Sequence, residues 1–129
     1  RYTIAWRSDT QHYSNRFPST FYAMTAYLRD AEKELNLKYV AHTGDLINNY
    51  GSERQWENAV RAMASIANIP AGVCAGNHDV KHDDALYDNF SRYYAFCRSY
   101  YRNNFQQAYA FIALRNIKNA FGYCVFRIA

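Results

Sequence analysis

The chain has 129 residues, which is the size of a single domain. Hydrophobic residues make up 50% of it and aromatic residues 18%, with only 5 Gly and 2 Pro, so the composition excludes disordered, collagen-like and low-complexity classes. The net charge is +4, and no apolar run approaches the roughly 18 residues of a membrane span, so we expect no membrane partner.

The first 80 residues alternate strand and helix patterns. Residues 2–6 form a short run with high β propensity, and residues 37–43 form a second one that ends at Gly44. Between them, Pro18 opens a helix whose apolar residues recur at steps of three and four. That helix therefore has one buried face, made of Phe21, Met24, Leu28, Ala31 and Leu35.

A second helix and a third strand follow. Ser52-x-x-Gln55 has the form of a capping box, and the helix that it opens closes at Pro70. Residues 71–75 form the third strand. The order βαβαβ predicts a parallel α/β sheet with right-handed crossovers.

The patterns after residue 80 are weaker. Residues 83–101 favour a helix, while residues 108–114 and 121–128 favour two strands of a β-hairpin around a turn at 116–119. The chain shows no internal repeat and no linker. We therefore expect one domain over residues 1–129.

Polar clusters follow each of the three predicted strands. Asp9-Thr10-Gln11 follows the first, Gly44-Asp45 the second, and the run from Gly76 to Asp79 (Gly-Asn-His-Asp) the third. In open parallel sheets, ligands bind just past the carboxyl ends of the strands, so these clusters are expected at one edge. Carboxylate and amide oxygens with an imidazole nearby suit two divalent cations, which together can activate water and clamp a phosphoryl group.

These motifs resemble the calcineurin-like metallophosphoesterase family, whose pattern runs D-x-[H/Q], G-D and G-N-H-[D/E]. The resemblance covers roughly residues 2–90, and Gly-Asn-His-Asp one βα unit after Gly-Asp is its specific part. It implies that the chain is the parallel βαβαβ half of an αββα sandwich, followed by a helix and a hairpin.

The resemblance also implies roles for individual residues. Asp9 would bind the first metal, Asp45 would bridge two metals, and Asn77 would bind the second metal with its amide near the phosphate. His78 would contact the phosphoryl oxygen or protonate the leaving group, and Asp79 would hold the His78 ring through its other nitrogen. The cofactors implied are two divalent ions, with Mn, Fe, Zn, Mg and Ca all open.

The chain departs from the family pattern at two places. Gln11 stands where most members have a metal-binding His, as in a D-T-Q subgroup, and would ligate through its amide oxygen. The family's later His and its G-H-x-H motif have no counterpart after His82. We therefore expect a truncated domain, completed by a missing C-terminal segment or by a second chain. Similar D-T-Q proteins are often exported bacterial enzymes, which favours a secreted or extracytoplasmic location.

Each candidate also has a structural interpretation. Asp9 and Asp45 could be helix N-caps or turn residues, although their shared sheet edge favours a functional one. His42, on a buried strand, is predicted to be a hydrogen-bonded core histidine. His12, in the loop after Asp9, could reach a substrate, whereas His82 fits a solvated helix start better than a metal site.

The leading hypothesis is metal-dependent hydrolysis of phosphomonoesters or phosphodiesters. One alternative is a binding module that keeps the scaffold with too few ligands for two metals. Another is a nuclease, because residues 89–129 hold 6 basic residues, no acidic one and 12 of the 21 Tyr and Phe. No recognition motif accompanies that composition, and amphipathic side chains at a core edge explain it better, so nucleic acid is not expected.

Overall fold

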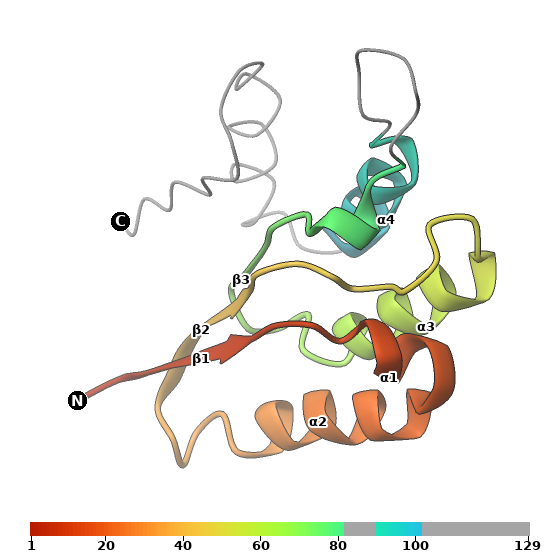
Figure 1. Ribbon diagram of the computed structural model, residues 1–129. Coiled ribbons are helices and arrows are strands. Elements are labelled where there is room, and N and C mark those ends of the chain that lie inside the picture. Colours follow the sequence, from red (N-terminus) through yellow and green to blue (C-terminus); the bar gives the residue numbers. More distant parts are fainter. Residues whose placement is uncertain (82–89, 102–129) are drawn as a thin grey trace.

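The structure, a computed structural model, describes residues 1–81 and 90–101 (Figure 1). Three parallel strands form its sheet in the order β1-β2-β3. These are β1 (Thr3–Arg7), β2 (Leu37–His42) and β3 (Ala71–Val73). The parallel βαβαβ arrangement predicted from the sequence is thereby confirmed for this part of the chain.

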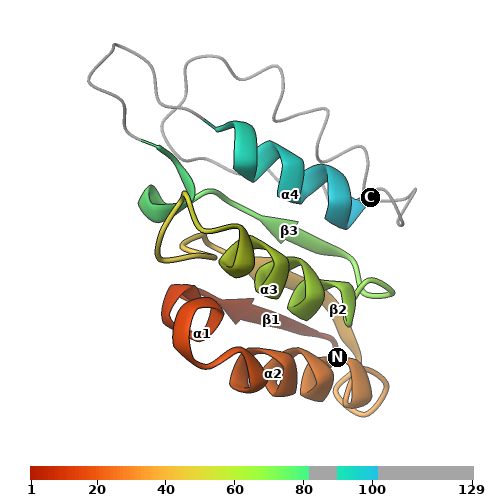
Figure 2. The same ribbon diagram turned by 90° about the vertical axis from the view of Figure 1, so that its right-hand side faces the viewer.

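Helices connect the strands and cover the sheet on one side. They are α1 (Gln11–Arg16), α2 (Pro18–Asp30), α3 (Glu53–Ala64) and α4 (Ser91–Tyr101), with a short 3₁₀ turn, η1 (Asn77–Asp79), after β3. Figure 2 shows α1, α2 and α3 on the viewer's side of the sheet and α4 beyond β3, and α3 contacts both α2 and α4. Within the described ranges, no helix has the length and apolar character needed to cross a membrane.

Helix boundaries differ from the sequence patterns in three places. The segment after Asp9 was expected to be a loop, but Gln11–Arg16 is a helix. The helix from Pro18 ends at Asp30, before the last predicted apolar position at Leu35. Residues 31–36 form turns, and Asn36, with a positive φ of 48°, directs the chain into β2. The helix of residues 53–64 ends before Ile69, because i→i+3 hydrogen bonds tighten the chain over residues 62–69.

The hydrophobic core lies between the sheet and its helices. Phe21 of α2, Val40 of β2 and Met63 of α3 are fully buried and belong to one cluster. From α4, Tyr93 and Cys97 join the same cluster. Residues 83–89 of the predicted helix, and the predicted hairpin at 108–128, lie outside the described residues.

The opposite face of β1 is open. Ile4 and Trp6, which alternate with the inward-facing residues, are 48% and 75% exposed. Parallel sheets are ordinarily covered on both faces, so this apolar face is the part of the sheet that the described helices do not complete.

Arg7 ends β1 and points to the helix side. Its guanidinium lies 4.9 Å from the centre of the Phe21 ring, and the residue is only 8% exposed. None of its three side-chain nitrogens has a hydrogen-bond partner among the described residues. Burial lowers the pKa of this guanidinium to about 10. A buried cation of this kind costs stability, since no counter-charge from the described part of the chain pairs with it to offset its desolvation.

The loops that follow β2 and β3 cross in direct backbone contact. A Cβ built on Gly44 would collide with the backbone of Ala75 and Gly76, and one built on Gly76 would collide with Asp45. Gly44 also has a φ of 106°, which side chains disfavour. These two glycines therefore let the second and third sequence motifs lie against each other.

We predict that Gly76→Ala destabilises the fold by about 1–3 kcal/mol, because the added methyl group has only backbone and Asp45 to displace. Gly51→Ala is the matched control: its Cβ would meet only Asn49 Oδ1, at 3.4 Å, so its stability should change by less than about 1 kcal/mol. Chemical denaturation of the two variants checks this, and equal stability losses would contradict it.

We also predict that Arg7→Met raises the free energy of unfolding by about 1–3 kcal/mol, because methionine keeps the packing on Phe21 without a buried charge. Arg61→Met is the control, since Arg61 is exposed and lies 4.6 Å from the Tyr22 ring centre. Its effect should be within about 1 kcal/mol. A loss of stability in Arg7→Met would show that the guanidinium has a counter-charge.

Candidate active site at the strand ends

The first motif leaves β1 through a left-handed turn. Asp9 has a φ of 53°, its side chain is exposed, and Ser8 Oγ donates to its Oδ2 at 2.6 Å. Its backbone N–H donates to Gly44 O at 3.2 Å, which ties the first loop to the second. A positive φ is uncommon for a residue with a side chain, and here it turns the Asp9 carboxylate outward at the sheet edge.

The second motif contains two successive residues with positive φ. Gly44 (106°) is followed by Asp45 (53°), and Asp45 Oδ1 accepts a hydrogen bond from the backbone N–H of His78 at 3.0 Å. The carboxylate of the second motif is therefore held against the backbone of the third. Among the described residues, Asp45 Oδ2 accepts no hydrogen bond, so it is available to a ligand.

His42, the last residue of β2, hydrogen-bonds to both the first and the second loop. It is 1% exposed, its Nδ1 accepts from Gly44 N–H at 3.2 Å, and its Nε2 lies 3.0 Å from Thr10 Oγ1. Because Nδ1 accepts, the ring is neutral and Nε2 carries the hydrogen that bonds to Thr10. Burial, assisted by the charge of Arg7, lowers the pKa of His42 to about 3. The prediction of a hydrogen-bonded core histidine is confirmed.

Asp79 is fully buried and binds only backbone amides in the described structure. Its Oδ1 accepts from Leu46 N–H at 2.8 Å and Ile47 N–H at 3.3 Å, and its Oδ2 accepts from Gly76 N–H at 2.9 Å. Burial raises the pKa of this carboxyl to about 6, although the three amides favour its charged form. Asp79 therefore fastens the second loop to the third.

The expected contact between Asp79 and the His78 ring is wrong. The ring instead makes a 2.9 Å hydrogen bond from Nδ1 to the carbonyl oxygen of Asn48. The carboxylate of Asp79 lies inward, where the loop amides occupy it. Because a carbonyl oxygen only accepts, Nδ1 of His78 carries the hydrogen, and Nε2 is the nitrogen that remains for a substrate.

The remaining candidates are placed around these loops. Gln11 is the first residue of α1, and its Oε1 is buried with no hydrogen-bond partner among the described residues. His12 is exposed on α1 rather than in a loop, and Asn77 is exposed on η1. His82 lies outside the described ranges.

This donor set fits hard divalent cations. Within residues 1–81 and 90–101, no three His, Cys, Asp or Glu side chains gather closely enough to hold a metal ion. The expected ligands differ from that kind of cluster, since they are two carboxylates (Asp9, Asp45) and two amides (Gln11, Asn77). Oxygen donors of this type suit Mg, Ca and Mn, and the buried, unsatisfied Oε1 of Gln11 is an acceptor that a cation would satisfy.

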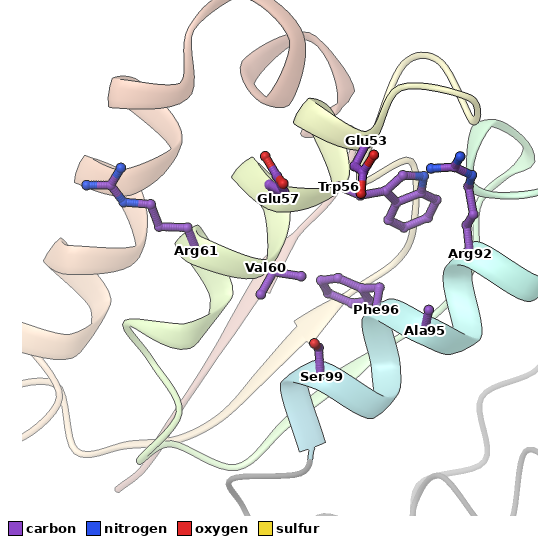
Figure 3. Close-up of a pocket in the computed structure, with 9 residues that line it drawn as sticks. All are labelled: Glu53, Trp56, Glu57, Val60, Arg61, Arg92, Ala95, Phe96 and Ser99. Atoms are coloured by element: carbon purple, nitrogen blue, oxygen red, sulfur yellow. The ribbon is translucent and has the colours of Figure 1, made fainter.

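A groove of about 400 Å³ lies elsewhere, between α3 and α4. Figure 3 shows Val60 and Phe96 pointing towards each other across it, with Arg92 beside Trp56. None of the residues that line the groove belongs to the three motifs. The groove is therefore separate from the candidate site at the strand ends.

Two residues with structural roles at the site were missed from the sequence. Gln55 was assigned to a capping box with Ser52, but Ser52 makes no side-chain cap bond, and Gln55 Oε1 accepts from the amides of Asn48 and Asn49 instead. Asn48 acts through its carbonyl oxygen, which any residue could supply. The sequence offered one signal for this contact, the Gln in the first turn of the helix. Because that residue fits a capping box with Ser52 equally well, its partner could not be assigned from the sequence.

The depressed pKa of His42 predicts a pH dependence. Between its ordinary pKa of 6.5 and its folded pKa of about 3, the unfolded chain binds a proton that the folded chain does not. This group's contribution to stability is therefore lost as pH falls through that window. Between about pH 7 and pH 5 the loss is about 2 kcal/mol.

Urea denaturation of the parent and of His42→Gln at several pH values checks this prediction. The parent should lose more stability on acidification than the variant, by the amount that His42 contributes. If the free energy of unfolding falls equally with pH in the two proteins, His42 is not the neutral, buried group described above.

Comparisons with known proteins identify the family. The profile of the family described as calcineurin-like phosphoesterase matches residues 2–127. A Bacillus subtilis (strain 168) protein described as "Uncharacterized protein YvnB" is 46% identical over 95 residues, which are 72% of this chain and 7% of that protein. The chain therefore spans a small part of that relative's length.

No solved structure shows a significant match to the chain. The family profile nevertheless covers nearly the whole sequence, including all three motif loops that the structure brings into contact. On these grounds, the chain belongs to the calcineurin-like phosphoesterase family.

Proposed function

We propose that this chain hydrolyses phosphate monoesters or diesters with two divalent cations held at the strand ends. The observation that carries the proposal is the direct bonding of the three motif loops. Asp9 N–H donates to Gly44 O, and Asp45 Oδ1 accepts from His78 N–H. Family membership supports ester hydrolysis, and the loop contacts support one shared site for its residues.

Asp9, Gln11, Asp45 and Asn77 would hold the cations. Asp9 and Asp45 bring the negative charge that a divalent ion needs, while Gln11 and Asn77 offer amide oxygens. When bound, such cations lower the pKa of water and neutralise charge on the phosphoryl oxygens. Mn, Fe, Zn, Mg and Ca all remain candidates.

The protein's own residues act on the substrate from the third loop. His78 keeps a hydrogen on Nδ1 through the Asn48 carbonyl, so Nε2 is the nitrogen that would exchange a proton with the substrate. In the imidazolium form of the ring, Nε2–H would donate to a phosphoryl oxygen or deliver its proton to the leaving-group oxygen. The exposed amide of Asn77 would bind the phosphate, and the exposed His12 of α1 would contact the rest of the substrate. Asp79 would assist only by holding the loops.

Further parts of the site would come from beyond these residues. Because the sequence holds no histidine after His82, we propose that another segment or a second chain supplies further ligands. An extracytoplasmic bacterial location stays a prediction.

Replacing Asp45 by Asn tests the proposal. The variant should show no binding of Mn²⁺ by calorimetry. Its kcat/KM for nitrophenyl phosphate should fall by at least about 100-fold, because losing a residue that only supports a metal ligand already costs about 10–100-fold. The fold should survive, because the Asn oxygen still accepts from His78 N–H.

Asp30→Asn is the matched control. Asp30 is an exposed carboxylate of α2 paired with Arg29 at 2.7 Å, so its loss should leave metal binding and turnover unchanged. Retained hydrolysis in Asp45→Asn would contradict the proposal. Failure of the parent to bind divalent ions would favour a binding module.

A further inference from the structure

We propose that Gln55 is a positioning residue that sets the tautomer and direction of the His78 ring through the Asn48–Asn49 peptide bond. The catalytic value of this arrangement rests on the proposed function of His78. The arrangement itself rests on four residues that the structure places in one hydrogen-bonded row.

The row begins on α3. Gln55 lies in the first turn of that helix and is 4% exposed. Its Oε1 accepts from Asn48 N–H at 2.8 Å and from Asn49 N–H at 2.9 Å. One buried oxygen therefore fixes two successive amides of the loop after the second motif.

One peptide unit carries this restraint to His78. The N–H of Asn49 and the C=O of Asn48 belong to the same planar group, and in a trans peptide they point in opposite directions. The described residues contain no cis peptide bond. Gln55 therefore binds the N–H side of this unit while His78 Nδ1 binds its C=O side, at 2.9 Å.

A neighbouring contact holds the same loop. Trp56, the residue after Gln55 in α3, donates from Nε1 to Tyr50 O at 2.9 Å. Two consecutive residues of α3 therefore hydrogen-bond to the backbone of this loop. Without the Gln55 oxygen, the amides of Asn48 and Asn49 would lose their acceptor, and a peptide that rotates to recover hydrogen bonds would carry the Asn48 carbonyl away from His78.

Nitrogen-15 NMR of the histidine rings in the metal-free chain, under mildly alkaline conditions, tests the proposal. In the parent, His78 should carry its hydrogen on Nδ1, and the amide of Asn49 should exchange slowly with solvent. In Gln55→Met, which keeps the side-chain length but removes the acceptor, the His78 ring should populate both tautomers. In Gln55→Glu, whose carboxylate still accepts from both amides, the parent tautomer should return.

Turnover adds a second measurement. Gln55→Met should lower kcat about 10–100-fold with little change in KM, and Gln55→Glu should recover most of it. Glu57→Met is the control for a methionine on the same helix, since Glu57 is exposed and lines the α3–α4 groove. It should leave both the His78 tautomer and kcat unchanged.

An unchanged His78 tautomer in Gln55→Met would overturn the proposal. If that variant does not fold, two other results would overturn it: a changed tautomer in Gln55→Glu, or fast exchange of the Asn49 amide in the parent. An inactive parent that also binds no Mn²⁺, but whose tautomer follows Gln55, would refute the phosphoesterase proposal and leave the positioning role standing.

Discussion

The contact between Gly44 and Gly76 is the constraint on which the rest of the site depends. At this point two loops from neighbouring strands touch through their backbones, with no room for a Cβ on either side. The contact brings Asp45 within hydrogen-bond distance of the His78 amide, and so places the second and third motifs in one site. A parallel sheet alone would leave these loops one strand spacing apart, roughly 5 Å.

Backbone strain at the edge serves the same arrangement. Asp9 and Asp45, the two carboxylates of the candidate site, both have a φ of 53°. Such conformations cost about 1–3 kcal/mol each and persist only where the surroundings enforce them. Here the Asp9 N–H bond to Gly44 and the Asp45 bond to His78 enforce them, so the acidic side chains are aimed by the loops.

The sequence predicted the three strands and the edge at which their polar clusters meet, because both follow from local periodicity and from the parallel topology. It identified the core role of His42 for the same reason. It did not predict the partner of Asp79 or that of Gln55. Both choices depend on which backbone amides the tertiary fold leaves unpaired, and nothing in residue spacing reports that. The short helix of Gln11 and His12 was also missed, since its six residues lack an apolar period.

The loop between β2 and α3, which carries the second motif, is irregular in its backbone and yet firmly held. It makes no strand ladder, yet the amides of five of its residues each meet a buried side-chain acceptor. His42 accepts from one amide, Asp79 from two and Gln55 from two, at Gly44, Leu46, Ile47, Asn48 and Asn49. A buried amide without an acceptor costs about 1–3 kcal/mol, so these acceptors strongly favour one loop conformation. Because the acceptors come from β2, η1 and α3, any shift of one element would break bonds to the others. The buried polar residues thus hold the loop, while Asp9 and Asn77 are exposed at the same edge of the sheet.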